Sequence, residues 1–114
     1  MLNDIPPEDL SPTVDLTPDE RWSLFAGQTA RIEWNELAPL FARGQVVVVD
    51  ASLDLVDVAV AVADDNKSLV EQWMQQKLFG LLDTQTASAW AQGATPVWAV
   101  VVHPWVLAQA RQIQ

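Results

Sequence analysis

The stretch QVVVVDASLDLVDVAVAVADD, residues 45–65, decides the expected fold because it contains two valine-rich runs with different patterns. The first run, residues 45–50, has strand length and no alternation, which is typical of a central strand covered on both faces. The second run, residues 54–64, alternates valines with mainly alanines, so a second strand with a valine face and an alanine face is expected. Because a short link joins the two runs, we expect an antiparallel hairpin.

Two helices are expected before this stretch, as an N-terminal helical pair. The segment Thr17–Glu20 combines a capping threonine, a proline at the first helical position and a capping-box glutamate, so a helix should run from there to about Ala30. A second, short helix should begin after Asn35 as its cap and end at Gly44, which can adopt the left-handed conformation.

The rest of the chain predicts alternating helices and strands around one small sheet. The order gives an α+β fold, with helices packed on a mixed or mainly antiparallel sheet of three to four strands. Residues 106–110 are compatible with either a helical turn or an extended strand. The other expected elements are a helix capped by Asp64 or Asp65, a short strand within 77–82, a helix capped by Asp83 and closed by Gly93, and a strand at 97–103.

Acidic residues are concentrated at the N-terminus of this 114-residue chain, whose formal net charge is -9. The first twenty positions hold six acidic residues, no basic residue and four of the seven prolines. We therefore predict that residues 1–16 form a disordered acidic arm, either a solvating tail or a short linear motif, and that residues 17–114 form a single domain. The six basic residues are scattered, so no nucleic-acid partner is expected.

Several classes of site are excluded by composition. The chain has no cysteine, which removes thiolate catalysis, disulfides and cysteine-rich zinc sites, and its single histidine argues against His-rich metal centres. No phosphate-binding loop or hydrolase signature occurs, and no cofactor is expected. The longest apolar runs, residues 58–63 and 96–102, are too short to cross a bilayer, and no secretory signal is recognisable. We expect no membrane association and a cytoplasmic location.

A candidate polar cluster consists of Asp50, Asp54 and His103. If the strand at 97–103 ran parallel to the strand at 45–49, His103 and Asp50 would emerge at the same end of the sheet. They could then form an acid–base pair or bind a small molecule or a divalent cation. If the strands were antiparallel, the two residues would lie at opposite ends, and the aspartates would serve only local turns and caps.

A candidate interaction surface comes from the tryptophans and the alanine face. Four of the six tryptophans, at positions 22, 73, 90 and 98, fall on apolar stripes assigned to the core. Trp34 and Trp105 lie at turns or element ends and are expected to be exposed. The alanine face could admit a second copy of the chain. The residues of this surface are Trp34, Trp105, Ala59, Ala61 and Ala63, and they predict a non-catalytic interaction or regulatory module that binds a protein partner or self-associates as a homodimer.

The order of several short segments also carries a family resemblance. The segments are TARIEWNEL at 29–37, FARG at 41–44, SLDLV at 52–56, WAVVV at 98–102 and PWVL at 104–107. With them, residues 28–110 resemble a family of small bacterial proteins catalogued as domain of unknown function 2288. The resemblance implies a bacterial, stand-alone, cytoplasmic domain, and it brings no activity, cofactor or catalytic residue.

Overall fold

A computed structural model describes residues 17–93 and 95–111, so the predicted arm at residues 1–16 lies outside the described residues. The elements follow in the order α1 (Pro18–Gln28), β1 (Ala30–Ile32), α2 (Trp34–Ala42), β2 (Val46–Val49), α3 (Leu55–Ala63), α4 (Lys67–Gln75), β3 (Phe79–Leu81), α5 (Thr84–Ala91), β4 (Val97–Val102) and β5 (Trp105–Ala110).

The strands form one mixed sheet in the order β1-β4-β5-β2-β3. Strands β2 and β5 pair in parallel, and the other three neighbouring pairs are antiparallel. The predicted α+β class and mixed sheet are confirmed, but the sheet has five strands rather than three to four. The additional edge strand β1 is only three residues long and has no β-branched run, so its pairing with β4 creates it rather than a pattern in the sequence.

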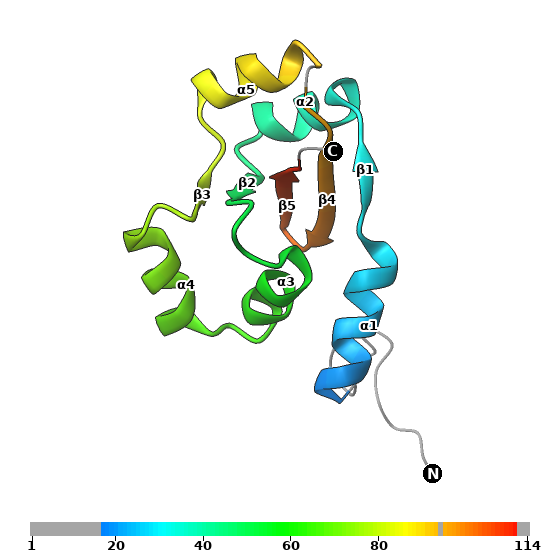
Figure 1. Cartoon of the computed structure of the whole chain (residues 1–114), viewed down its shortest axis with the longest axis vertical. Helices are drawn as coiled ribbons and strands as arrows, with labels where there is room; N and C mark the ends of the chain where they lie inside the picture. Colours follow the sequence, from blue (N-terminus) through cyan, green and yellow to red (C-terminus); the bar gives the residue numbers. More distant parts are fainter. Residues whose placement is uncertain (1–16, 94, 112–114) are drawn as a thin grey trace.

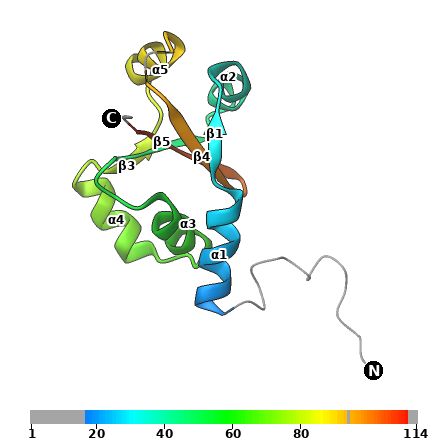
Figure 2. The same cartoon turned by 45° about the vertical axis from the view of Figure 1, so that its right-hand side comes forward.

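Helices cover both faces of the sheet (Figures 1 and 2), with α1, α3 and α4 on one side and α2 and α5 on the other. Strand β2 supplies both cores. Val47 and Val49 pack with α1 and α3, whereas Val46 packs in the cluster that contains α2 and α5. The prediction of a central strand covered on both faces is therefore confirmed.

The N-terminal helices do not form a pair, which corrects the prediction. Strand β1 separates α1 from α2, and the two helices lie on opposite faces of the sheet (Figure 2). The predicted capping box of α1 is present, since Thr17 Oγ1 accepts a hydrogen bond from the Glu20 amide at 3.1 Å and Glu20 accepts one from the Thr17 amide at 2.9 Å. Glu33, not Asn35, caps α2.

The segment predicted as a second strand is helix α3, so the predicted hairpin does not exist. Its N-terminus is capped by Asp54, whose carboxylate accepts hydrogen bonds from the amides of Val56 and Asp57 at 2.9 and 3.1 Å. Nearly every residue of this segment is apolar, so alternating valine and alanine does not distinguish a strand from a helix buried on most sides. The strand positions beside β2 are taken by β5 and β3 instead.

Several of the remaining predictions are confirmed. Residues 79–81 form the expected short strand, Asp83 caps α5, and Gly44 and Gly93 adopt positive φ angles of 71° and 76°. Helix α4 is capped by Asn66 rather than by Asp64 or Asp65. A two-residue turn, His103-Pro104, joins β4 to β5, so residues 105–110 are a strand.

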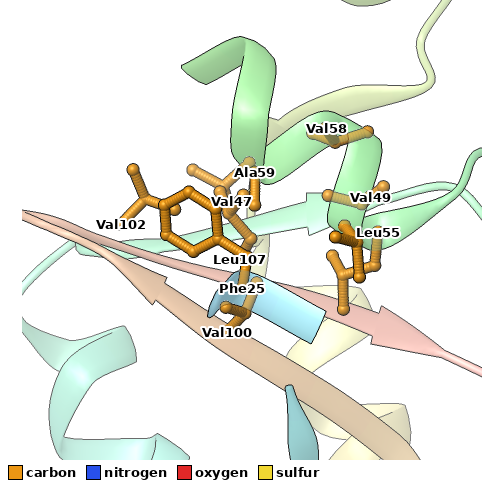
Figure 3. Close-up of a cluster of buried hydrophobic side chains, with 10 residues drawn as sticks. Phe25, Val47, Val49, Leu55, Val58, Ala59, Val100, Val102 and Leu107 are labelled. Carbon is orange, nitrogen blue, oxygen red and sulfur yellow. The ribbon is translucent and has the colours of Figure 1, made fainter. Parts of the chain in front are cut away.

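Two contacts besides packing attach α1 to α3. The Trp22 indole N–H donates to Asp57 at 2.7 Å, and Arg21 forms an ion pair with Asp64. Trp22 is consequently exposed, which corrects its assignment to the core, whereas Trp90 is buried and Trp73 and Trp98 are half-buried. Phe25 completes the attachment because it enters the core between α3 and the sheet (Figure 3).

The side-chain amide of Gln109, a buried residue of β5, forms hydrogen bonds to the connection between β2 and α3. Its Nε2 donates to the carbonyl oxygens of Asp50 at 2.9 Å and Leu53 at 2.7 Å. Its Oε1 accepts from Arg111 Nε at 2.8 Å, and the Arg111 guanidinium lies 5.2 Å from the centroid of the Trp98 ring. These hydrogen bonds hold the residues that precede the Asp54 cap of α3 against β5.

A core substitution on β5 tests the packing of the face that α3 covers. Leu107 is completely buried in that core, whereas Leu81 is 63% exposed. We expect Leu107→Ala to lower the free energy of unfolding by about 2–5 kcal/mol through lost burial and a cavity. Leu81→Ala, the matched control, should change it by no more than about 0.5 kcal/mol. Urea denaturation followed by circular dichroism measures both, and equal losses would contradict the described packing.

Candidate functional site

The predicted polar cluster is not assembled by the fold. Strand β4 is antiparallel to β5 and β5 is parallel to β2, so β4 and β2 run in opposite directions. His103 follows β4 and Asp50 follows β2, which places these two residues at opposite ends of the sheet. The grouping of His103 with Asp50 and Asp54 is therefore wrong. Among the described residues, no three histidine, aspartate or glutamate side chains are grouped so that they could hold a metal ion.

The two aspartates of that cluster have local partners instead. Asp54 caps α3, and the Asp50 carboxylate accepts a hydrogen bond from the Ser52 amide at 2.9 Å. Hydrogen bonds from the Ser52 side chain and then its backbone lower the pKa of Asp50 below its usual value of 3.8. Asp50 is consequently ionised at neutral pH and is occupied by its own turn.

The predicted alanine face is also unavailable for binding. Because residues 55–63 form a helix, Ala59 and Ala61 are buried against the rest of the fold and Ala63 is half-buried. Trp34 is half-buried beside Phe41, with 6.0 Å between the ring centroids. Of the five residues predicted as an interaction surface, Trp105 is the one that the structure exposes.

Trp105 belongs to an apolar groove between α4 and β3, which we call the α4–β3 groove. It has a volume of about 340 Å³. Its floor is one face of the sheet, and its walls come from α4 and the end of α3. The apolar lining residues are Val47, Val62, Val70, Met74, Phe79, Leu81 and Trp105.

The exposed apolar side chains gather at this groove. Among the described residues, five large hydrophobic side chains are exposed, and three of them, Met74, Leu81 and Trp105, line the groove. Their exposed fractions are 53%, 63% and 36%. Single exposed apolar side chains are common on protein surfaces, but a concave cluster of them is typical of a binding site.

Helix α4 stands beside the sheet without entering its core. None of its residues is fully buried, and Trp73 attaches it to β3 by packing on Phe79 with 6.4 Å between the ring centroids. Met74 follows Trp73 and lines the groove. The apolar stripe that assigns Trp73 to the core gives no indication of a groove beside it. Only the tertiary structure shows that Met74, on this stripe, stays exposed.

A second, more polar hollow lies on the opposite face of β3. It has a volume of about 360 Å³, and Val48, Gly80, Asp50, Asp83 and Lys77 are among its lining residues. The backbone amide of Thr86 and then its side chain lower the pKa of Asp83, which caps α5. Across the groove and this hollow, the carboxylates Asp50, Asp65, Glu71 and Asp83 outnumber the ammonium groups of Lys67 and Lys77.

Comparisons with known proteins place the chain in a family. Residues 22–110 match the family model described as Protein of unknown function (DUF2288). The chain belongs to this family. It is also similar to the NMR solution structure of PA1075 from Pseudomonas aeruginosa, with 38% sequence identity, a TM-score of 0.73, and coverage of 89% of this chain and 93% of that one.

No match was found among curated proteins. The resemblance inferred from residues 28–110 is thereby confirmed, and the match begins slightly earlier, at residue 22. Within the described ranges, no helix has the length and apolar character that crossing a membrane requires.

The turn at Asp50 predicts a specific loss of stability in acid. Since the pKa of Asp50 is lowered in the folded state, its contribution is fully present above the usual value of 3.8 and is lost as the pH falls through the lowered folded pKa. Asp50→Asn keeps an oxygen acceptor and removes the titration, so its Tm should fall less than that of the native chain between pH 5 and pH 3. Ser52→Ala, which removes the hydroxyl donor, should also flatten the profile. Unchanged profiles for both variants in thermal denaturation would contradict this role.

Proposed function

We propose that this protein is a non-catalytic interaction module that binds an apolar segment of a partner protein in the α4–β3 groove. The observation that carries the proposal is the convergence of the exposed Met74, Leu81 and Trp105 on one hollow. Binding energy at protein interfaces is concentrated in a few large apolar and aromatic side chains that become buried together. A groove of about 340 Å³ offers room for such side chains from a partner.

Charge favours a basic partner segment over a second copy of the chain. The carboxylates around the groove and the second hollow outnumber the lysines there, and the whole chain has a formal net charge of -9. A second copy would bring the same negative charge to the interface, whereas lysine or arginine beside the apolar residues of a partner would complement it. The same acidity supports the expectation that the partner is not a nucleic acid.

The alternative of a small-molecule or metal-dependent enzyme has no comparable support. It needs Asp50, Asp54 and His103 in one cleft, and the strand directions separate His103 from the aspartates. The groove itself is lined mainly by apolar side chains, and its charged residues lie on α4 or just before it. The cytoplasmic location expected from the sequence stays a prediction.

A displayed library of random peptides tests the proposed function. The library is selected on the full chain, and each enriched peptide is then tested on the double variant Met74→Ser, Leu81→Ser. We expect the double variant to lose at least about tenfold in affinity because both apolar anchors are removed without adding charge. Isothermal calorimetry measures the affinities, and unchanged circular dichroism verifies folding.

Val101→Ser is the matched control. Val101 is 46% exposed and pairs with Val106 on the sheet face that α2 and α5 cover, away from the groove. Its substitution should leave peptide affinity unchanged. The proposal fails if no peptide is enriched, or if the double variant binds as the native chain does.

Sedimentation equilibrium tests the other candidate occupant of the groove, a second copy of the chain. We expect the full chain to stay monomeric at high micromolar concentration. A dimer that the double variant at Met74 and Leu81 dissociates would mean that a second copy occupies the groove, and it would overturn the proposal of a separate partner.

A further inference from the structure

Strand β3 lies at one edge of the sheet. The main-chain N–H and C=O groups on its outer side pair with no other described strand. Strand β3 is last in the strand order, and its inner edge pairs with β2. The Asp50 amide donates to the Leu78 carbonyl at 2.8 Å, and the Leu82 amide donates to the Val46 carbonyl at 3.0 Å. Because bonded and non-bonded residues alternate in antiparallel pairs, the N–H and C=O groups of Phe79 and Leu81 point away from the sheet. This outer edge is a template for one more strand.

Gly80, at the centre of β3, has no role within the described fold. Its φ angle is not in the left-handed region, and a Cβ built on it would have no neighbour within 4 Å. Glycine in a strand is destabilising relative to alanine, so neither conformation nor packing explains it here. A glycine in a strand is typical of a place where a ligand or another backbone approaches closely.

The two hollows lie where the side chains of an added strand would point. Successive side chains of a strand alternate between the two faces of a sheet. All three residues of β3 border both hollows, but the pairing with β2 places Phe79 and Leu81 on the face of Val49 and Val47, which is that of the apolar groove, and Gly80 on the face of Val48, which is that of the second hollow. One set of alternate side chains would therefore meet apolar residues, and the other set would pass over Gly80 toward Asp50 and Asp83.

We propose that a partner segment binds by adding an antiparallel strand to the outer edge of β3, with apolar residues at alternate positions facing the α4–β3 groove and lysine or arginine between them facing Gly80. This inference rests on the proposed function and adds to it the conformation and the sequence pattern of the partner. The antiparallel orientation places a residue opposite Gly80 at a non-hydrogen-bonded site, where the two backbones approach to about 4.5 Å. With no side chain at Gly80, the face of the sheet beside that partner residue is open.

An alternating peptide tests this inference directly. The probe is the acetylated, amidated heptapeptide KVKVKVK, and its control is the same composition in the blocked order KKKKVVV. We expect the alternating peptide to bind the full chain more tightly than the blocked one, and the double variant Met74→Ser, Leu81→Ser to abolish the difference. Equal binding of the two peptides would overturn the proposed pattern, because charge alone would then explain the affinity.

N-methylation of the probe tests main-chain pairing. In the proposed orientation the valine residues share a face with Phe79 and Leu81 and exchange hydrogen bonds with them, while the lysine amides point outward. N-methylation of the valine amides should abolish binding, and N-methylation of the lysine amides should leave it. Any other pattern overturns strand addition, yet the proposed function stands if library peptides still depend on Met74 and Leu81.

Substitutions at two glycines distinguish an effect on peptide binding from an effect on stability. Gly80→Val should leave the Tm unchanged or raise it, and should weaken binding of KVKVKVK by about fivefold because the valine side chain would lie on the face across which the lysine opposite Gly80 must pass. Gly27→Ala is the matched control, since a Cβ at Gly27 in α1 also has no neighbour within 4 Å. It should raise the Tm and leave binding unchanged. A Gly80→Val variant that binds as tightly as the native chain would contradict the role assigned to Gly80.

Discussion

The parallel pairing of β2 with β5 is the constraint on which the rest of the structure depends. Parallel neighbours need a long connection, and here it runs through α3, α4, β3, α5 and β4. Because those helices fall on both faces, β2 is buried on both, and Val46 and Val47 point into different cores (Figure 3 shows the core with α3). Gln109 fixes this arrangement by bonding the chain where it leaves β2.

The groove lies where the sheet ends. Strand β3 is the last strand of the sheet, and α4 packs beside it with no fully buried residue. Met74 of α4 is therefore left exposed beside Leu81 of β3. Trp105 reaches the same hollow from the start of β5, which neighbours β2.

Local signals predicted those elements whose cause is local. The capping box at Thr17, the cap at Asp83 and the left-handed glycines at 44 and 93 act within a few residues, so the structure reproduces them. The alternating pattern at residues 54–64 predicted a strand where the structure has a helix. These residues are nearly all apolar, so the pattern fits a helix buried on most sides as well as a strand. That error also produced the expected alanine face, which the helix buries.

The sequence by itself determined the family, the α+β class, the doubly covered strand β2 and several helix caps, because these depend on composition, side-chain shape and neighbouring residues. Tertiary structure alone decided the strand directions, and with them the separation of His103 from Asp50. It also decided which apolar side chains stay exposed at the groove. The physical reason is that contacts between residues far apart in the chain decide which strands pair and which side chains are buried. Local sequence patterns do not predict these contacts.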